Sequence, residues 1–206
     1  MSVRVLTVCG SIKPFSANRA AIEVAHSYMR SRRDVELEDY ADLARIPPFN
    51  AALDDDPGPV VTAWRKRIGS SDAVLIAAPE YAGALAGTIQ NALDWIVGSG
   101  ELYAKPVAVM SAGTTGGPFA RQMLIQTLTW QGAHVVAQMG IAAPRTKSDA
   151  DGRLTDDATI AEIERLTAVL VDAPTLDADA RLELVRTVVA TAGVDIGRIA
   201  PPTSRP

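Results

Sequence analysis

The sequence contains a single cysteine, Cys9, among its 206 residues. One thiol cannot form an internal disulfide bond, and such sparse cysteine usage is typical of proteins in a reducing compartment. The chain also has only 2 histidines, and no His or Cys cluster has the spacing of metal ligands. The sequence therefore predicts no metal site.

Long apolar runs and an excess of basic residues are also absent. No segment approaches the ~18 consecutive apolar residues of a membrane-spanning helix, and residues 1–8 lack the length and cleavage pattern of a signal peptide. The formal net charge is -4, with a pI near 5.2, so the broad positive field of a nucleic-acid or membrane binder is missing. We expect a cytoplasmic protein that binds neither nucleic acids nor membranes.

The apolar residues that are present, 48% of the chain, are enough for one compact α/β domain. Short runs rich in β-branched residues alternate with stretches of helical periodicity. This alternation predicts a doubly wound, five-stranded parallel sheet with helices on both faces and right-handed crossovers. The expected strands cover residues 3–9, 35–40, 73–78, 106–111 and 134–139, and the expected helices cover residues 18–29, 60–68, 87–97 and 119–131. Residues 46–59, rich in proline and aspartate, are expected to form a surface loop.

The last third of the chain is expected to add helices only. Residues 158–171 form a last core helix in this prediction, and residues 177–192 form an extra amphipathic one. That extra helix lies outside a minimal five-strand unit and packs either on the domain or on a partner subunit. We therefore expect a domain over residues 1–174, a C-terminal helical extension over 175–206, and a disordered tail from residue 201.

In a doubly wound sheet, ligands bind at the carboxyl ends of the strands, so the loops after the first, third and fourth strands matter most. The first loop, residues 10–18, combines hydroxyl and amide side chains with one cation just before a helix N-terminus, a suitable setting for a phosphate. It fits neither the GxxxxGK[ST] nor the GxGxxG pattern, which argues against ATP and against a Rossmann-type dinucleotide site. The alternative is that Ser16 or Asn18 simply caps the helix.

The other two loops favour close approach of a flat ligand to the main chain. The second, residues 79–87 (PEYAGALAG), holds a proline, a tyrosine and two glycines, and small residues allow a heteroaromatic ring to reach main-chain groups. The third, residues 111–118 (SAGTTGGP), contains three glycines and three hydroxyl side chains. In the simpler interpretation, each is an ordinary turn in which a glycine supplies a positive φ.

Together the loops resemble those of the NADPH-dependent FMN reductase family of flavodoxin-like proteins, which includes quinone, azo-dye and chromate reductases. GSIKPFSAN is similar to the family's GSxRxxSxN, PEYAGALAGTIQNALDW to PEYNxSxPGxLKNAxDW, and SAGTTGG to SxGxxGG, with the similarity spanning residues 3–140. Lys13 replaces the family's arginine, which turns a bidentate fork into a point charge. Ala82 replaces a frequent asparagine, and Ala84 and Ala86 replace a serine and a proline.

The resemblance implies bound FMN, with three sets of contacting residues. Residues at the start of the first helix would hold the phosphate, the second loop would line the isoalloxazine, and the third would approach its polar edge or the ribityl chain. The implied cofactor-binding residues are Ser11, Lys13, Ser16, Ala17, Asn18, Pro79, Glu80, Tyr81, Ala82, Gly83, Ser111, Gly113 and Gly116.

The resemblance also implies an oxidoreductase that moves electrons from NADPH or NADH through FMN to a small acceptor by a ping-pong mechanism. The acceptor would be a free flavin, a quinone, an azo compound or a metal oxyanion, and the protein a homodimer or homotetramer. Because the cofactor carries the chemistry, we expect no catalytic side chain. Two alternatives stay open: a flavodoxin-type one-electron carrier, and a binding module without flavin.

Several conspicuous residues are expected to be structural. Asp94 is expected to make a structural hydrogen bond and Trp95 to pack in the core. His26 and His134 lie away from the three loops, and Cys9 is expected to behave as a small buried hydrophobe without a catalytic role.

Overall fold

The computed structural model describes residues 2–194, in which a five-stranded parallel sheet separates two layers of helices. The strand order is β2-β1-β3-β6-β7, and each neighbouring pair is parallel. This confirms the predicted doubly wound sheet. The strands are β1 (Val3–Cys9), β2 (Val35–Tyr40), β3 (Ala73–Ala77), β6 (Pro106–Gly113) and β7 (His134–Ala142).

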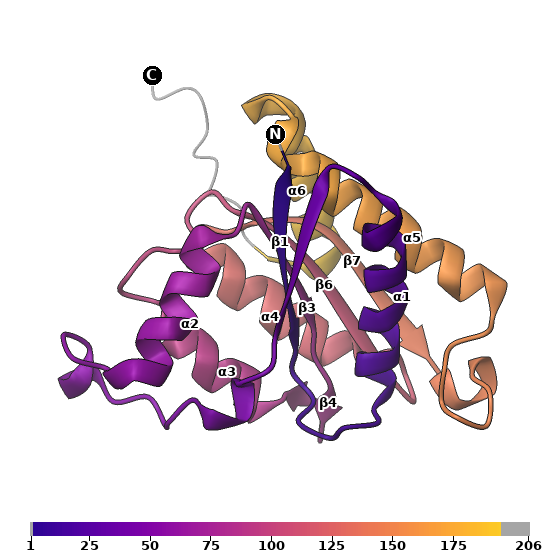
Figure 1. The fold of residues 1–206 in the computed structure, drawn as a ribbon, viewed down its shortest axis with the longest axis horizontal. Helices are drawn as coiled ribbons and strands as arrows, with labels where there is room; N and C mark the ends of the chain where they lie inside the picture. The colour runs from indigo at the N-terminus through magenta and orange to yellow at the C-terminus, as the bar shows by residue number, and fades with distance from the viewer. Residues whose placement is uncertain (1, 195–206) are drawn as a thin grey trace.

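Helices connect the strands and cover both faces. Figure 1 shows α1 and α5 on one side of the sheet, and α2, α3 and α4 on the other. The carboxyl ends of the strands point toward the lower edge of that view, where α1 begins and β4 lies. The helices are α1 (Ala17–Ser31), α2 (Gly58–Ser70), α3 (Gly87–Asp94), α4 (Pro118–Trp130), α5 (Asp157–Asp172) and α6 (Ala178–Ala192). Four short 3-10 segments cover Leu43–Arg45, Ala51–Leu53, Pro144–Lys147 and Ala173–Thr175.

The core follows from the hydrophobic pattern of the central strands. Every residue of β3, AVLIA, is buried, as expected for a strand with helices on both faces. On α1, the apolar residues Ala21, Ile22, Ala25 and Met29 recur at helical spacing and are all buried. Burial of each large aliphatic side chain contributes about 1.5–3 kcal/mol, so this pattern fixes which face of each helix meets the sheet.

Two strands run further than the sequence predicts. The pairing of β6 with β7 continues beyond the expected ends at residues 111 and 139, because Ser111 lies opposite Gly140 and Gly113 opposite Ala142. On the other side, β3 ends at Ala77 opposite Met110. The last residues of β6 therefore have no strand partner on the β3 side.

The second loop also contains structure that the sequence did not reveal. A short antiparallel hairpin joins β4 (Glu80–Tyr81) to β5 (Ala84–Leu85). Its two central residues, Ala82 and Gly83, have φ values of 52° and 71°, the positive values that a type I′ hairpin turn requires. The following helix, expected over residues 87–97, ends earlier at Asp94, where Trp95 is the C-cap.

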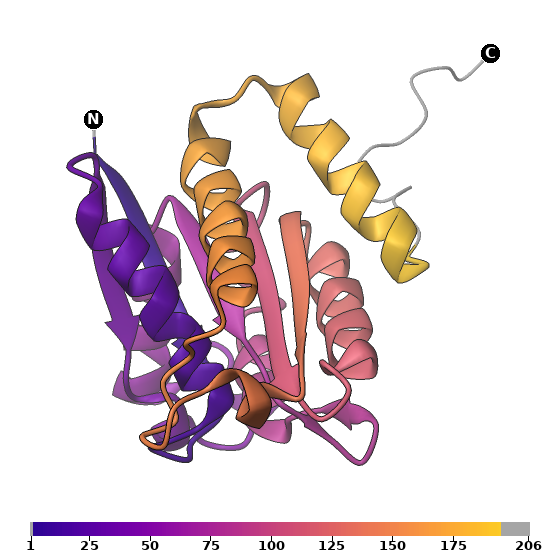
Figure 2. The ribbon, with the colours of Figure 1, turned by 90° about the vertical axis from the view of Figure 1, so that its right-hand side faces the viewer.

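The C-terminal helix α6 packs on the domain, against β7 and α4. Val185, Val188 and Val189 are its buried residues, and the Gln122 side chain on α4 donates a hydrogen bond to the Ala192 carbonyl at 3.1 Å. Figure 2 shows α6 as the yellow helix on the β7 side of the sheet. The division between residues 174 and 175 remains a prediction, and the expected disordered tail from residue 201 lies outside the described residues.

Between residues 2 and 194, none of the helices combines the length and apolar character needed to cross a membrane.

Candidate functional site

Three loops converge at the carboxyl end of the sheet, as the strand order requires. They follow β1, β3 and β6, the three strands at the centre of the order. From β1 the chain adds β2 on one side and then β3 on the other, and doubly wound proteins bind ligands at such a reversal of strand order. The loops are tied together by hydrogen bonds between side chains and main chain.

The first loop ends in a capped helix whose leading N–H groups are available. Ser16 is the N-cap of α1, and its hydroxyl accepts a hydrogen bond from the Arg19 N–H at 3.1 Å. Ser16 therefore caps the helix, and its hydroxyl hydrogen is still available to donate to a ligand. The N–H groups of Ala17 and Asn18, in the first turn, have no intrahelical acceptor. Lys13 is exposed, and among residues 2–194 no hydrogen bond or ion pair engages its ammonium.

Asn18 joins the first loop to the third. Its side chain is 3% exposed, donates to the Ala112 carbonyl at 3.1 Å and accepts from the Ala112 N–H at 2.9 Å. It pairs with β6 as a neighbouring strand would, just beyond the point where β3 has ended. The side chain is thus engaged internally, which leaves its main-chain N–H for a ligand.

A second connection joins the first loop to α3. The Thr88 hydroxyl donates to the Gly10 carbonyl at 2.9 Å, and a Cβ on Gly10 would lie 2.9 Å from the Ile89 side chain and 3.2 Å from the Ala78 Cα. Sequence reasoning missed Thr88, although a hydroxyl residue directly after Gly87 in the second motif was a usable signal. Gly10 is required because the two loops approach this closely.

Two buried residues lie where β1 passes into the first loop: Cys9 at the end of the strand and Ser11 near the start of the loop. Ser11 is 9% exposed, and its carbonyl accepts a weak hydrogen bond from the Cys9 thiol at 3.5 Å. Burial raises the pKa of the Cys9 thiol, although the bond to Ser11 opposes the shift. A buried thiol with a raised pKa is a poor nucleophile, consistent with the absence of a catalytic role.

The hairpin of the second loop presents main-chain groups and one tyrosine to solvent. Pro79 is buried, whereas Tyr81, Ala82 and Gly83 are exposed. A Cβ on Gly83 would lie 3.9 Å from the Phe119 ring of α4, which is itself exposed. The hairpin turn and the first turn of α4 therefore lie side by side at the surface.

Glu80 fastens this hairpin to α4. Its Oε2 accepts hydrogen bonds from the N–H groups of Phe119 at 2.8 Å and Ala120 at 3.0 Å. The N-cap of α4 is Gly117, which offers no side chain, and Pro118 has no N–H. The carboxylate thus supplies the cap from another loop, a role that the sequence did not indicate.

The third loop depends on glycines at two close approaches. Gly117 has φ 60°, and a Cβ there would lie 1.9 Å from the Ser111 hydroxyl oxygen and 2.7 Å from the Ser111 Cβ. Gly116 has φ 78° and packs against the β7 main chain, with a Cβ position 3.2 Å from the Gly140 carbonyl carbon. Gly113, also expected at the site, has no neighbour within 4 Å of its Cβ position.

Arg121 supports the third loop from below. Its Nε donates to the Gly116 carbonyl at 3.2 Å, and its guanidinium also bonds to the Gln138 side chain. Burial lowers the pKa of Arg121, and the nearby Glu80 carboxylate acts in the opposite direction. The two charged groups therefore attract each other across the second and third loops.

The remaining residues of the second motif hold a neighbouring loop. The Asn91 side chain donates to the Pro47 carbonyl at 2.9 Å, and the Trp95 indole N–H donates to the same oxygen at 2.8 Å. Asp94 accepts a hydrogen bond from the Gln90 side chain at 2.8 Å, and Trp95 is fully buried. The structural roles expected for Asp94 and Trp95 are confirmed.

The available groups fit FMN. The first turn of α1 offers main-chain N–H donors, with the Lys13 cation in the same loop, for a phosphate. The Ser111 hydroxyl is buried, and no hydrogen bond satisfies it among residues 2–194, so a polar group would have a partner there. The exposed hairpin turn offers main-chain groups to the edge of a flat ring.

The chain is similar in sequence to known flavin-dependent reductases. The family model described as NADPH-dependent FMN reductase matches residues 3–147. The chain is 35% identical to an NAD(P)H-dependent FMN reductase of Pseudomonas aeruginosa over 75% of its own length and 86% of that protein. It is 32% identical to an NAD(P)H:quinone oxidoreductase of Solanum tuberosum, with 82% and 90% of the two chains covered.

Solved structures give the same result. A flavoenzyme NAD(P)H:(acceptor) oxidoreductase of Paracoccus denitrificans superimposes with a TM-score of 0.69 at 25% identity, and the match covers 90% of this chain and 98% of that one. A flavodoxin of Bacillus cereus, at 15% identity and a TM-score of 0.55, supports the flavodoxin-like fold alone.

Proposed function

The chain belongs to the NADPH-dependent FMN reductase family, and from this premise we propose that it passes electrons from NADPH or NADH, through FMN bound at the three loops, to a quinone-type acceptor. It is an NAD(P)H-driven oxidoreductase with FMN as cofactor. One observation supports this site most directly. The N–H donors at the start of α1 have no internal acceptor and can bind a ligand, whereas Glu80 joins the second loop to the N-terminus of α4. When bound, FMN supplies the hydride and electron chemistry, and the protein supplies position.

In this proposal, each loop holds a different part of the cofactor. The phosphate lies at the start of α1, with the N–H groups of Ala17 and Asn18, the Lys13 ammonium and the hydroxyls of Ser11 and Ser16 as partners. The hairpin residues Pro79, Glu80, Tyr81, Ala82 and Gly83 line the ring. Ser111, Gly113 and Gly116 lie beside its polar edge or the ribityl chain.

The substrates use one open face of this site in turn. The exposed side chains of Tyr81 and Phe119, 61% and 56% accessible, border the opening and offer apolar area to a flat donor or acceptor. Successive occupation of one pocket is the structural basis of ping-pong kinetics. Relatives named as quinone oxidoreductases from three plants and a 2-hydroxy-1,4-benzoquinone reductase of Burkholderia support a quinone as acceptor.

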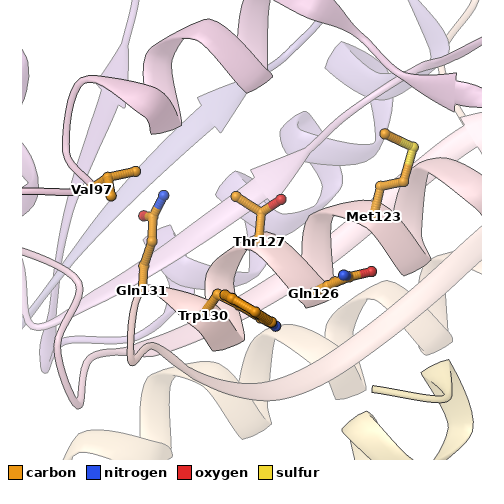
Figure 3. Close-up of a pocket in the computed structure, with 6 residues that line it drawn as sticks. All are labelled: Val97, Met123, Gln126, Thr127, Trp130 and Gln131. Carbon is orange, nitrogen blue, oxygen red and sulfur yellow. The ribbon is translucent and has the colours of Figure 1, made fainter. Parts of the chain in front are cut away.

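A homodimer or homotetramer is part of the proposal. A hollow of about 500 Å³ is lined by Val97 and by residues of α4 and the following turn, and none of the lining residues is charged (Figure 3). Val97 and Trp130 are 60% and 57% exposed. An uncharged, partly apolar face of this kind suits a second copy that presents the same face about a two-fold axis.

A cytoplasmic location completes the proposal. The proposed electron donors, NADPH and NADH, are metabolites of the cytoplasm. The single cysteine, Cys9, is buried and forms no disulfide, as is usual for proteins of a reducing compartment.

Anaerobic titration of the purified protein tests the function. The protein should be yellow, and stoichiometric NADPH should bleach it without a chemical reductant. Initial rates against NADPH at several quinone concentrations should give parallel double-reciprocal lines. A protein that is yellow but inert to both nucleotides would instead be a flavodoxin-type carrier, and a colourless protein that fails to bind added FMN would contradict the flavin site.

The oligomer has its own test. Val97→Lys places a charge on the uncharged face and should lower the mass measured by light scattering, whereas Leu53→Lys, at another exposed apolar position, should not. A wild-type protein that is monomeric at micromolar concentration would contradict this part of the proposal.

A further inference from the structure

Two helix N-termini at the carboxyl end of the sheet are used in opposite ways. At α1, a neutral serine caps one N–H and leaves the leading N–H groups available. At α4, both N–H groups of Phe119 and Ala120 are taken by one oxygen of Glu80. A helix N-terminus favours negative charge, so the Glu80 carboxylate occupies the position where an external anion would bind.

We propose that Glu80 is an internal anion that closes the α4 end of the site and makes it favour uncharged acceptors, such as neutral quinones, over oxyanions and other anionic acceptors. This inference rests on the proposed function, because it concerns the acceptor that follows the donor at the same opening. It identifies Glu80 as a positioning and specificity residue rather than a catalytic one.

The position of Glu80 in the fold links the carboxylate to the opening. Glu80 begins the hairpin whose turn, Ala82 and Gly83, borders Phe119. Its Oε2 carries both hydrogen bonds to α4, and among residues 2–194 no hydrogen bond occupies its Oε1. Negative charge therefore remains beside the hairpin, where it repels an anion.

Arg121, the cation that interacts with Glu80, keeps its charge in wild type and in the Glu80 variants alike, so it does not account for a difference between them. Arg121 is committed to the Gly116 carbonyl and the Gln138 side chain, and it is half-buried below the loop. A Cβ on Gly140 would lie 3.0 Å from the Arg121 guanidinium carbon, so the side chain is confined by β7. Its hydrogen bonds stabilise the third loop in wild type and variants.

The first experiment uses the apoprotein and sulfate as the probe, without any flavin. Glu80→Ala removes the internal anion and should open α4 to an external one. The melting temperature of each protein is measured in 0 and in 50 mM sulfate. The increase caused by sulfate should be several degrees larger for Glu80→Ala than for wild type. Glu164→Ala, which removes an exposed carboxylate from α5, controls for the general stabilising effect of sulfate, and its increment should equal that of wild type.

The second experiment measures acceptor preference with Glu80→Gln. The amide oxygen can still accept both hydrogen bonds, so the hairpin stays attached while the charge is lost. At low salt, the ratio of kcat/KM for ferricyanide to kcat/KM for an uncharged benzoquinone should rise about three- to tenfold and fall back in 0.3 M salt. Glu164→Gln should leave the ratio within twofold of wild type.

The outcomes separate this inference from the proposed function. An equal sulfate increment in Glu80→Ala and wild type overturns the closed anion site. An unchanged acceptor ratio in Glu80→Gln overturns the selectivity, since a merely structural role would alter both acceptors equally. Loss of the proposed function itself would appear in wild type as a failure to bind FMN, and the sulfate comparison would still decide the role of Glu80.

Discussion

The first loop and the pair formed by the second and third loops use their polar groups differently. In the first loop, Lys13 is exposed and the leading N–H groups of α1 have no internal acceptor. In the other two, Glu80 binds the α4 N-terminus and Gly116 and Gly117 pack without space for a side chain. If FMN binds as proposed, phosphate affinity comes from groups that are left available in the first loop, and the shape of the ring pocket comes from groups that are already satisfied in the other two.

Substitutions in the two regions are expected to have different effects on FMN binding and on stability. Changes at exposed positions of the first loop, such as Lys13, should alter FMN binding while leaving the free energy of unfolding of the apoprotein unchanged. Changes in the second and third loops should alter stability first, and binding through it. Asn18 lies where the two regions meet and should affect both.

The largest effect is expected for Gly117→Ala. A Cβ would lie 1.9 Å from the Ser111 oxygen, and the residue must hold a left-handed φ of 60°. Overpacking and the unfavourable conformation together should lower the free energy of unfolding by about 2–5 kcal/mol. Urea denaturation of the apoprotein measures the change.

Gly152→Ala is the matched control for Gly117→Ala. Gly152 has φ 79° but nothing within 4 Å of its Cβ position, so only the conformational part, about 1–2 kcal/mol, should appear. An equal loss of unfolding free energy in the two variants would show that the Ser111 side chain moves away at no cost. The third loop would then have room for a side chain at Gly117.

Asn18→Ala should have the next largest effect. It removes two hydrogen bonds and leaves the main-chain N–H and C=O of Ala112 buried without partners. An unsatisfied buried group costs about 1–3 kcal/mol, and with about 1–2 kcal/mol for each of these two groups, at the end of a strand, a total loss of about 2–4 kcal/mol is expected in the same denaturation experiment.

Asn50→Ala provides the comparison for Asn18→Ala. The Asn50 side chain accepts one exposed hydrogen bond, from the Ala52 N–H at 3.0 Å, so its removal should cost about 1 kcal/mol or less. An Asn18→Ala protein as stable as Asn50→Ala would mean that water replaces the side chain at β6 and that the two regions are not joined there.

Lys13→Ala tests the first loop alone. A charged hydrogen bond to phosphate is worth ~1.5–3 kcal/mol, so FMN should bind roughly ten- to a hundredfold more weakly. Riboflavin lacks the phosphate and should bind as before, and apoprotein stability should not change because Lys13 is exposed. Fluorescence titration of the apoprotein with both flavins measures the difference, and equal weakening of the two would remove Lys13 from the phosphate site.

The fold could be predicted because the strands and helices have recognisable local hydrophobic patterns. AVLIA at β3 is apolar throughout, and Arg4 and Thr7 alone interrupt the apolar run VRVLTVC at β1. The alternation of such runs with helices predicts the doubly wound parallel sheet that the structure shows. Boundaries were less predictable where tertiary pairing extends an element. The last residues of β6 and β7 continue as strands only because they face each other and Asn18 fills the vacant side of Ala112.

The candidate site was predictable in its loops but not in its internal contacts. Motif spacing identified Ser11, Pro79 and Ser111, whereas the bonds from Glu80 to α4 and from Thr88 to Gly10 join residues 39 and 78 positions apart. No local pattern reports such a pairing. The hairpin was also missed, because alanine at its first turn position hides the Asn-Gly signal by which such turns are recognised.

The smallest change in stability is expected at Ala82. Ala82 holds φ 52°, a left-handed conformation that asparagine tolerates better than alanine. Ala82→Asn creates an Asn-Gly pair in a type I′ turn and should raise the free energy of unfolding by about 0.5–1 kcal/mol. Ala82→Val should lower it by at least as much, because a β-branched side chain suits this conformation least. Both changes lie in the ring region, so the ratio of FMN to riboflavin affinity should stay constant while stability moves. A changed ratio with unchanged stability would mean that the hairpin contacts the phosphate end of the ligand, and the separation between the two regions would fail.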